Sequence, residues 1–263
     1  MRRIGQFAVA CLLAGAVALP AVGQKTRYWR QSSYEDFEKG TAKGVALRSD
    51  GRLLLAPRFE QFADPNLAYL WTMRTDSKGR LYAAGGSNAR VLRMEAGNKP
   101  YPVFESQELA AQALAIDAQD NLYVGTSPDG KVYKVTPRGE KTVFFEPNTK
   151  YIWDLEIDAA GTLYVATGDK GEVFAVTPDG KGEIFFKSDE THIRALAFDA
   201  QGNLIAGTDP SGMIVRLEKA ATGVHAFVVY ETARKEVTAL VADRSGYLYG
   251  AAIGQKSPGT KTQ

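Results

Sequence analysis

Short runs of alternating apolar and polar residues, separated by turn residues, follow one another along most of the chain. Four such runs lie at residues 152–158, 162–168, 172–177 and 183–187. Their length, their content of Leu, Val, Ile and aromatic residues, and the turn residues between them are typical of β-strands. Thr177-Pro178-Asp179-Gly180 has the composition of a tight turn. No long segment keeps a helical period, so the pattern predicts a nearly all-β chain.

The same group of four runs recurs along the sequence. Its marker is the phrase Asp-x-x-(Gly)-x-Leu-Tyr or a close variant, which begins at Asp76, Asp117, Asp158, Asp199 and Asp243. These aspartates are spaced by 41, 41, 41 and 44 residues, and the three extra residues fit in the loop around 219–224. Four short strands per repeat of this length predict a β-propeller built from four-stranded antiparallel blades. We expect the aspartates to stabilise their own turns by bonding to backbone amides, rather than to bind a ligand.

Four repeats are complete, and a fifth begins at residue 236 but ends near residue 253, after two strands. Residues 44–71 resemble 130–153 in their order of strand, polar turn, strand, Pro-Asn and Tyr-aliphatic-Trp. We therefore expect residues 44–66 to supply the outer strands of the fifth blade and to pair with residues 237–253. The alternative is that the chain is the N-terminal part of a larger ring. In either case the propeller is predicted to span 44–254, after a cap or linker at 24–43 and before a disordered tail at 255–263.

The N-terminal residues 1–23 have the features of a signal peptide. Arg2 and Arg3 form a positive region, residues 7–19 are apolar, and Ala21-Val22-Gly23 has the small-x-small pattern of a cleavage site. The alternative is an uncleaved membrane anchor, but the apolar run is shorter than the roughly 20 residues needed to span a bilayer. We therefore expect export to the periplasm or the extracellular space, with no integral membrane segment after cleavage.

Removal of this segment changes the charge and the cysteine content. The whole chain has 32 basic and 30 acidic residues, and the segment contains two of the basic ones, so the mature chain is formally neutral. A neutral surface lacks the electrostatic footprint of a nucleic-acid-binding protein. Cys11, the only cysteine, leaves with the signal, so the mature protein needs no disulfides in an oxidising compartment. A hydrophobic content of 44% excludes a disordered chain.

The phrases DAQGNLIAGTDPSGMIVRL, from Asp199, and DGKVYKVTPRGEKTVFF, from Asp129, resemble the repeats of NHL-type and gluconolactonase-like propellers. The resemblance covers roughly residues 68–252 and implies a propeller fold. Gluconolactonase-like enzymes hold a divalent metal at the axis with an early Glu plus Asn and Asp. This sequence has no convincing equivalent of their opening Glu-Gly-Pro motif, so those ligands are not carried over. No WD dipeptide ends a predicted strand, so the chain does not resemble a WD-repeat protein.

Candidate binding residues come from the strand ends near the predicted axis. Five residues before each repeat aspartate, the chain has Trp71, Gln112, Trp153, Arg194 or Thr238. Tyr69, Tyr151 and His192 stand two residues earlier in their own repeats. Aromatic rings with one Arg and one His suit a sugar ring or a peptide side chain. The alternative is that the tryptophans are core residues between blades. Loops on the same face contribute Asn88, Asp129 and Asp169 as further candidates.

Asp154 and Glu156 stand where other repeats have mostly Thr or Ala. Two residues apart on a strand, they share a face. One expectation is an interblade salt bridge with Arg74 or Arg194. The other is that the two carboxylates line a hydrated site in which Asp154 helps to bind a ligand. A calcium site would need further oxygens, for which Asn88, Asp129 or Asp169 are candidates.

Two functions are compatible with these observations. The favoured hypothesis is a non-enzymatic binding or scaffold module that uses its axial face to hold a protein, a peptide or a carbohydrate. The alternative is a metal-dependent hydrolase or lyase of the gluconolactonase-like type. Motifs for a serine nucleophile elbow and for a phosphate-binding loop are missing from the sequence. His192 and His225, without cysteines in the mature chain, cannot build a zinc site. We therefore expect no cofactor, with calcium as the only candidate ion.

Overall fold

A computed structural model describes residues 30–57, 60–86 and 88–255. The predicted signal peptide, most of the tail and part of the predicted linker lie outside the described residues. The chain divides into two compact units, residues 1–60 and 61–263. The expectation that the propeller begins at residue 44, across this division, stays a prediction.

The described part of the first unit is a short helix and a β-hairpin. Helix α2 (Tyr34–Glu38) begins with Ser33 as its N-cap, whose hydroxyl accepts a hydrogen bond from the Asp36 backbone N–H. Asp36 in turn accepts from the Ser33 backbone, which completes a capping box. Strands β1 (Val45–Leu47) and β2 (Leu53–Leu55) pair antiparallel. All three residues of β2 are exposed, Leu55 to 91%.

The second unit contains four complete sheets, each of four antiparallel strands in chain order. Blade 1 comprises β3 (Leu70–Thr75), β4 (Leu81–Gly85), β5 (Arg90–Met94) and β6 (Tyr101–Phe104). Blade 2 comprises β7 (Ala110–Ile116), β8 (Leu122–Ser127), β9 (Val132–Val135) and β10 (Lys141–Phe145). Blade 3 comprises β11 (Ile152–Ile157), β12 (Leu163–Thr167), β13 (Glu172–Val176) and β14 (Gly182–Lys187).

Blade 4 comprises β15 (His192–Phe198), β16 (Leu204–Asp209), β17 (Met213–Ala220) and β18 (Gly223–Glu231). A fifth, two-stranded sheet follows, made of β19 (Arg234–Ala242) and β20 (Leu248–Gln255). The longer fourth repeat extends the β17–β18 hairpin, as the spacing of the aspartates indicated. The prediction of an all-β propeller with four-stranded antiparallel blades is confirmed.

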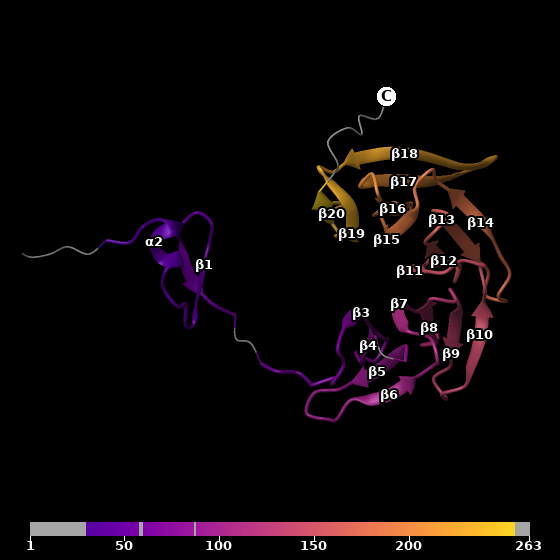
Figure 1. The fold of residues 1–263 in the computed structure, drawn as a ribbon, viewed down its shortest axis with the longest axis horizontal. Coiled ribbons are helices and arrows are strands. Elements are labelled where there is room, and N and C mark those ends of the chain that lie inside the picture. The colour runs from indigo at the N-terminus through magenta and orange to yellow at the C-terminus, as the bar shows by residue number, and fades with distance from the viewer. Residues whose placement is uncertain (1–29, 58–59, 87, 256–263) are drawn as a thin grey trace, which may run out of the picture. The chain divides into compact units, whose positions relative to one another are not determined.

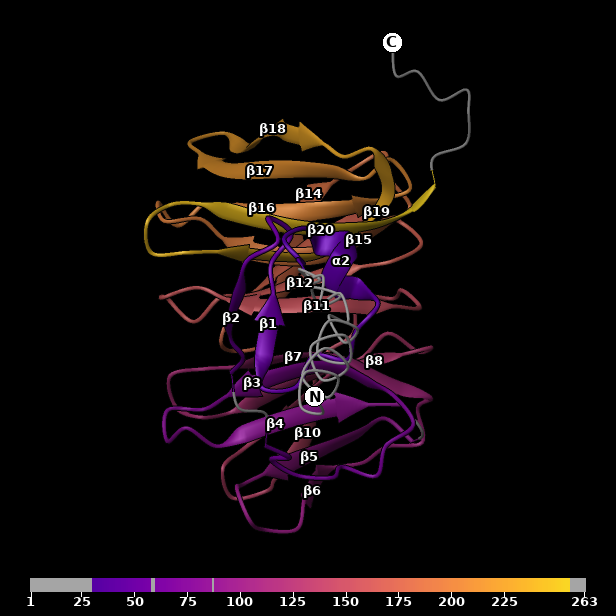
Figure 2. The same ribbon diagram turned by 90° about the vertical axis from the view of Figure 1, so that its left-hand side faces the viewer.

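The sheets follow one another around a common centre, with β3, β7, β11, β15 and β19 innermost (Figure 1). Figure 2 shows β15, β11, β7 and β3 one below another. Apolar clusters fill the spaces between consecutive blades, and Leu114, Leu155 and Leu196 occupy equivalent places in them with at most 2% exposure. Met73, the equivalent residue of blade 1, is 53% exposed.

Each repeat aspartate stabilises the turn that it begins. Asp117 Oδ1 accepts hydrogen bonds from the backbone N–H groups of Gln119 and Asn121, and its Oδ2 accepts from the Tyr123 hydroxyl. The other four aspartates make the same two backbone bonds. The predicted turn role of these residues is therefore confirmed.

The fourth residue of this turn has a positive φ in every repeat. It is glycine in four repeats and Asp120, with φ 62°, in the other. Positive φ suits glycine and, among the other residues, is best tolerated by Asn and Asp. The Asp120 carboxylate also accepts from the backbone N–H and the hydroxyl of Ser77, which joins the turns of blades 1 and 2.

The expected pairing of residues 44–66 with residues 237–253 stays a prediction. Strands β1 and β2 form one two-stranded sheet, and β19 and β20 form another. Val237 is fully buried against blade 4, whereas Val241, Tyr249 and Ile253 are more than half exposed.

Candidate functional site

A β-bulge occurs at the same place in all five inner strands. The pairing register of each inner strand with its neighbour shifts by one residue there, so that a single residue is left out of the ladder. The bulged residues are Trp71, Gln112, Trp153, Arg194 and Thr238. A bulge interrupts the alternation of a strand and redirects a side chain. The backbone therefore sets apart a position of the inner strands at which the repeats differ widely in chemistry.

We call this end of the inner strands the axial mouth. In blade 3, the Tyr151 and Trp153 rings stack, with centroids 4.9 Å apart and planes 10° apart. The Arg194 guanidinium carbon lies 3.7 Å from the centroid of the Trp153 ring, a cation–π contact. Arg194 Nε also pairs with Glu236 Oε1 at 2.6 Å. The mouth therefore contains a continuous chain of contacts across blades 3 and 4 to strand β19.

His192 packs edge-on against the same aromatic pair. Its Nδ1 accepts a hydrogen bond from Trp153 Nε1 at 3.2 Å and a longer one, at 3.4 Å, from the backbone N–H of Asp169. Because Nδ1 is an acceptor, the neutral ring carries its hydrogen on Nε2. Gly168 makes this arrangement possible, since a Cβ there would lie 2.7 Å from both His192 Nδ1 and Trp153 Nε1.

A second aromatic pair occupies the corresponding place in blade 1. Tyr69 and Trp71 stack with centroids 5.7 Å apart and planes 19° apart, over Gly86. They are 63% and 51% exposed. Gln112, the bulged residue of blade 2, does not cover them; its Oε1 accepts a hydrogen bond from the Ser127 hydroxyl at 2.7 Å.

The two pairs belong to a repeat of 82 residues, twice the length of a blade. Residues 69–150 and 151–232 share Tyr-x-Trp at their start and Gly-Thr-Ser/Asp-Pro-x-Gly before their second-last strand. They also share an interblade bond. Glu108 accepts from the backbone N–H of Asp129, and Glu190 accepts from that of Ser211. The doubled period is visible in the sequence, but a search confined to single blades misses it.

Asp154 and Glu156 line the axis one and three residues after the bulge. Arg74 Nη2, from blade 1, lies 3.0 Å from Glu156 Oε1 and 3.5 Å from Asp154 Oδ1. Asp154 Oδ2 also accepts from the backbone N–H of Leu196 in blade 4 at 2.8 Å. Asp154 therefore links three blades. The salt-bridge alternative is observed with Arg74, whereas Arg194 pairs with Glu236 instead.

Burial weakens the acidity of both carboxyl groups of this pair. Burial raises the pKa of Glu156 to about 7, with a further increase from the Asp154 charge and an opposing effect of Arg74. Burial also raises the pKa of Asp154, although Arg74 and the backbone N–H groups of Leu196 and Leu155 oppose it. Their side chains are 18% and 28% exposed, so both groups retain some contact with water.

The three loop candidates lie in two places. Asn88 and Asp129 line a separate hollow of about 730 Å³ whose wall includes Glu108, Lys131 and Tyr133 but none of the bulged residues. Asp169 contacts His192 through its backbone N–H, and its carboxylate lies 3.8 Å from Lys150 Nζ. The structure thus brings together Tyr151, Trp153, His192 and Arg194, with Asp154 below them, and places Trp71 in the equivalent pair of blade 1.

The axial carboxylates do not fit a divalent-metal site. Within residues 30–57, 60–86 and 88–255, no group of three or more His, Cys, Asp or Glu side chains is arranged to hold a metal ion. Asp154 and Glu156 both face the Arg74 guanidinium, which supplies the positive charge that they share. The oxygens suggested for a calcium site at Asn88 and Asp129 belong to the separate hollow.

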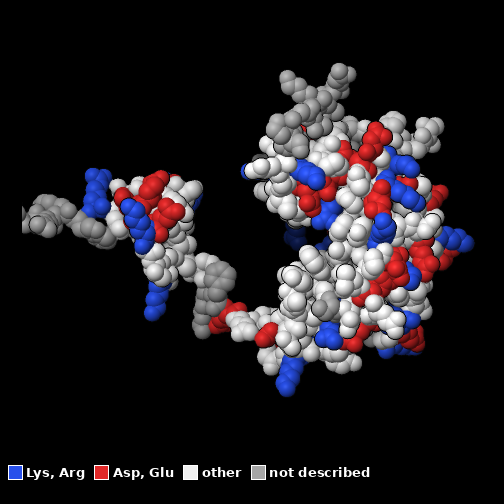
Figure 3. All heavy atoms as spheres, viewed as in Figure 1, with Lys and Arg blue, Asp and Glu red and all other residues white. Residues whose placement is uncertain are grey.

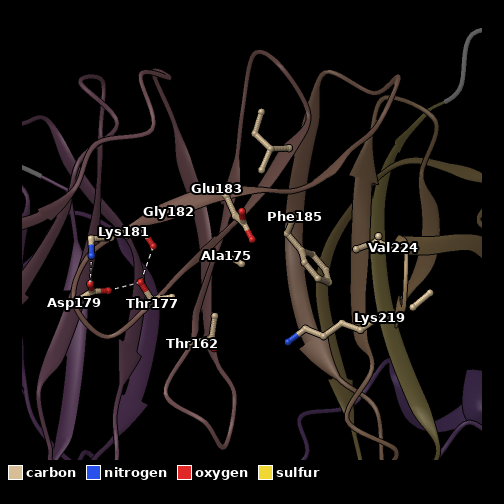
Figure 4. A pocket seen from close by; sticks show the side chains of 13 residues that line it. Thr162, Ala175, Thr177, Asp179, Lys181, Gly182, Glu183, Phe185, Lys219 and Val224 are labelled. Atoms are coloured by element: carbon tan, nitrogen blue, oxygen red, sulfur yellow. Dashed lines mark hydrogen bonds and ion pairs between the residues drawn. The ribbon is translucent and has the colours of Figure 1, made fainter.

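Another hollow lies between the outer strands of blades 3 and 4 (Figure 4). Its volume is about 820 Å³, and the lengthened β17–β18 hairpin forms one of its walls. Its charges are largely paired. Lys181 contacts Asp179 at 2.8 Å, and Lys219 lies 3.7 Å from Asp158 and over the Tyr164 ring. A hydrogen bond with Tyr164 raises the pKa of Lys219, so this lysine stays charged.

The visible surface of the second unit shows basic and acidic side chains interspersed (Figure 3). Among the described residues, no helix has the length and apolar character needed to cross a membrane.

Comparison with known proteins supports the fold alone. No family model and no curated protein sequence matches the chain. Among solved structures, virginiamycin B lyase from Staphylococcus aureus is similar over 79% of this chain and 70% of its own, with a TM-score of 0.60 and 13% identity. A gluconolactonase from Xanthomonas campestris matches over 71% and 70% of the two chains, with a TM-score of 0.60 and 15% identity.

A chain in a nidogen/laminin complex matches over 65% of this chain and 70% of its own, with a TM-score of 0.56 and 13% identity. Similar propellers therefore occur in enzymes and in a protein–protein complex. Identities this low leave the function of the present chain to its own residues.

Proposed function

We propose that the mature chain is an exported binding module that holds a protein, peptide or carbohydrate at its axial mouth. The β-bulge shared by all five inner strands carries the proposal. Directly below the bulge the interior blades repeat one another with buried Leu114, Leu155 and Leu196. At the bulged position itself, the five inner strands have two Trp, one Gln, one Arg and one Thr. Exposed aromatic rings beside polar groups are typical of recognition surfaces.

Export is supported by the sequence of residues 1–23 and by the absence of cysteine from the mature chain. The nidogen/laminin neighbour supports the idea that such a propeller serves in protein binding.

Binding of the purified mature chain to an array of oligosaccharides and peptides tests the proposal. A Trp71→Ala/Arg194→Ala variant should lose the binding seen with the wild type. Lys181→Ala, in the outer hollow, is the matched control and should keep it. Equal binding by the wild type and the mouth variant would refute an axial site.

The enzymatic alternative has one supporting feature, His192 at the mouth. Virginiamycin B lyase from Staphylococcus aureus, a structural neighbour, has a catalytically inactive histidine-to-alanine variant. His192 presents Nε2–H, but its Nδ1 is occupied by Trp153. Measurement of calcium content together with esterase and lactonase activity separates the hypotheses. Stoichiometric calcium, lost together with such an activity, would favour the enzyme.

A further inference from the structure

The two aromatic pairs at the mouth differ in what covers them. Over Tyr151 and Trp153 lie His192, which accepts the indole hydrogen bond, and the Arg194 guanidinium. The equivalent positions beside Tyr69 and Trp71, 82 residues earlier, are Ala110 and Gln112. Neither replaces the missing groups, because Ala110 has no ring and Gln112 bonds to Ser127.

The uncovered pair keeps the geometry of the covered one. Its rings remain stacked within 20° of parallel, over a glycine at the end of the neighbouring strand. Among the described residues, the Trp71 indole N–H has no hydrogen-bond acceptor, whereas Trp153 has one. We call the Tyr69–Trp71 pair the first copy and the Tyr151–Trp153 pair the second copy. The second copy indicates which groups the first copy lacks, namely a planar cation over the ring and an acceptor for the indole N–H.

We propose that the Tyr69–Trp71 pair binds an arginine side chain of a partner polypeptide, in the place that Arg194 takes over Trp153. A backbone carbonyl of the same partner accepts the Trp71 indole hydrogen bond, as His192 Nδ1 does for Trp153. This inference rests on the proposed role of the axial mouth in binding. It specifies the partner as a polypeptide and arginine as the residue recognised.

The charges around the axis suit a cation. Arg194 is neutralised by Glu236 at 2.6 Å, so the covered copy adds no net positive charge. Lower along the axis, Asp154 and Glu156 outnumber Arg74 by one charge when both are ionised. A guanidinium suits an indole face better than an ammonium does, because it is planar and more weakly hydrated.

The test uses acetyl-Gly-Arg-Gly-amide as the probe and the 15N-labelled mature chain. The Trp71 indole signal is identified by its loss in Trp71→Phe. We expect this signal to shift saturably with the arginine peptide, at a concentration roughly fivefold lower than with the citrulline peptide. The lysine peptide should also bind more weakly than the arginine peptide. Equal responses to the arginine and citrulline peptides would refute recognition of the cation. Equal binding of free L-arginine would refute a polypeptide partner.

Exchanging the covering residues between the copies gives matched controls. Ala110→His with Gln112→Arg should fill the first copy and abolish the shift of Trp71. His192→Ala with Arg194→Gln should empty the second copy and make the Trp153 indole respond to the peptide. If the first double variant does not fold, Gln112→Arg alone serves the same purpose. An unchanged Trp71 response in a folded, covered variant would overturn the proposal.

These outcomes are separable from the array experiment. If the Trp71→Ala/Arg194→Ala variant loses the array binding while the Trp71 indole signal responds to no peptide, the arginine inference fails and the axial site stands. If the wild type and the mouth variant bind the array equally, the axial site fails as well.

Discussion

Replacement of Glu156 by glutamine should make the protein more stable at pH 8 and leave its stability nearly unchanged at pH 5. Glu156 is held beside Asp154, and burial raises its pKa from 4.5 to about 7. A carboxyl with a raised pKa binds its proton more tightly in the folded than in the unfolded protein. Its ionisation therefore costs stability as the pH rises from 4.5 to 7, and the full cost remains above pH 7.

A difference of about 2.5 units corresponds to roughly 3 kcal/mol at 1.36 kcal/mol per unit. The Glu156 side chain is 28% exposed, and its titration is coupled to that of Asp154. We therefore expect about 2 kcal/mol. Glutamine cannot ionise, and its carbonyl can still accept a hydrogen bond from Arg74. Arg74 also keeps Asp154 as its charge partner, so no unpaired buried cation is left.

The assay is urea unfolding of the wild type and Glu156→Gln from pH 5 to pH 8. The quantity of interest is the difference between the two unfolding free energies at each pH. A difference that does not change with pH, or a wild type that is the more stable protein at pH 8, would refute the reasoning.

Three other changes test the fold and the site. Asp117→Ala should lower the unfolding free energy by roughly 2–4 kcal/mol, because two backbone N–H groups and the Tyr123 hydroxyl lose their acceptor; Asp117→Asn, measured by the same urea titration, should cost less. Gly168→Ala should cost about 1–3 kcal/mol, because its Cβ would overlap with His192 and Trp153, whereas Gly86→Ala, with 3.5 Å to its nearest neighbour, should melt like the wild type. If β1 pairs with β20 as the repeat predicts, Ala46→Cys with Tyr249→Cys should cross-link in a chain whose Cys11 is serine. An Ala46→Cys chain with Tyr101→Cys should not, and equal cross-linking of the two pairs would count against ring closure.

The blades could be predicted from the sequence because the strands and turns of each blade depend on residues that are close together along the chain. Asp-x-x-Gly turns form within five residues, and Asp117 shows the hydrogen bonds that the phrase implies. The strands between the turns alternate or contain β-branched and aromatic residues, and neighbouring blades bury them on both faces. The apolar runs then indicated four strands per blade, and the spacing of the aspartates indicated the place of the longer hairpin.

The site was only partly predictable, because its contacts depend on how blades lie against one another. The variable position was apparent from the aligned repeats, but the β-bulge was not, since a bulge is a property of pairing between strands. The aligned repeats offered Arg74 and Arg194 as partners of the carboxylate pair. They do not indicate that Arg74 is the one that reaches Glu156, 82 residues away, or that Arg194 pairs with Glu236 instead. Asn88 and Asp129 share a face with the mouth by topology, yet they line a hollow of their own.

The bulge explains how one scaffold can combine a repetitive core with a varied mouth. In a regular strand, replacing a small residue by Trp or Arg would place the new side chain among the tightly packed residues between blades. A bulged residue has no ladder partner, and its side chain is redirected away from that packing. Trp153 and Arg194 can therefore contact each other across a blade boundary while Leu155 and Leu196, two residues further along, remain buried. By the same reasoning, exchanging the bulged residues should alter what the mouth binds at much lower cost in stability than exchanging the leucines below it.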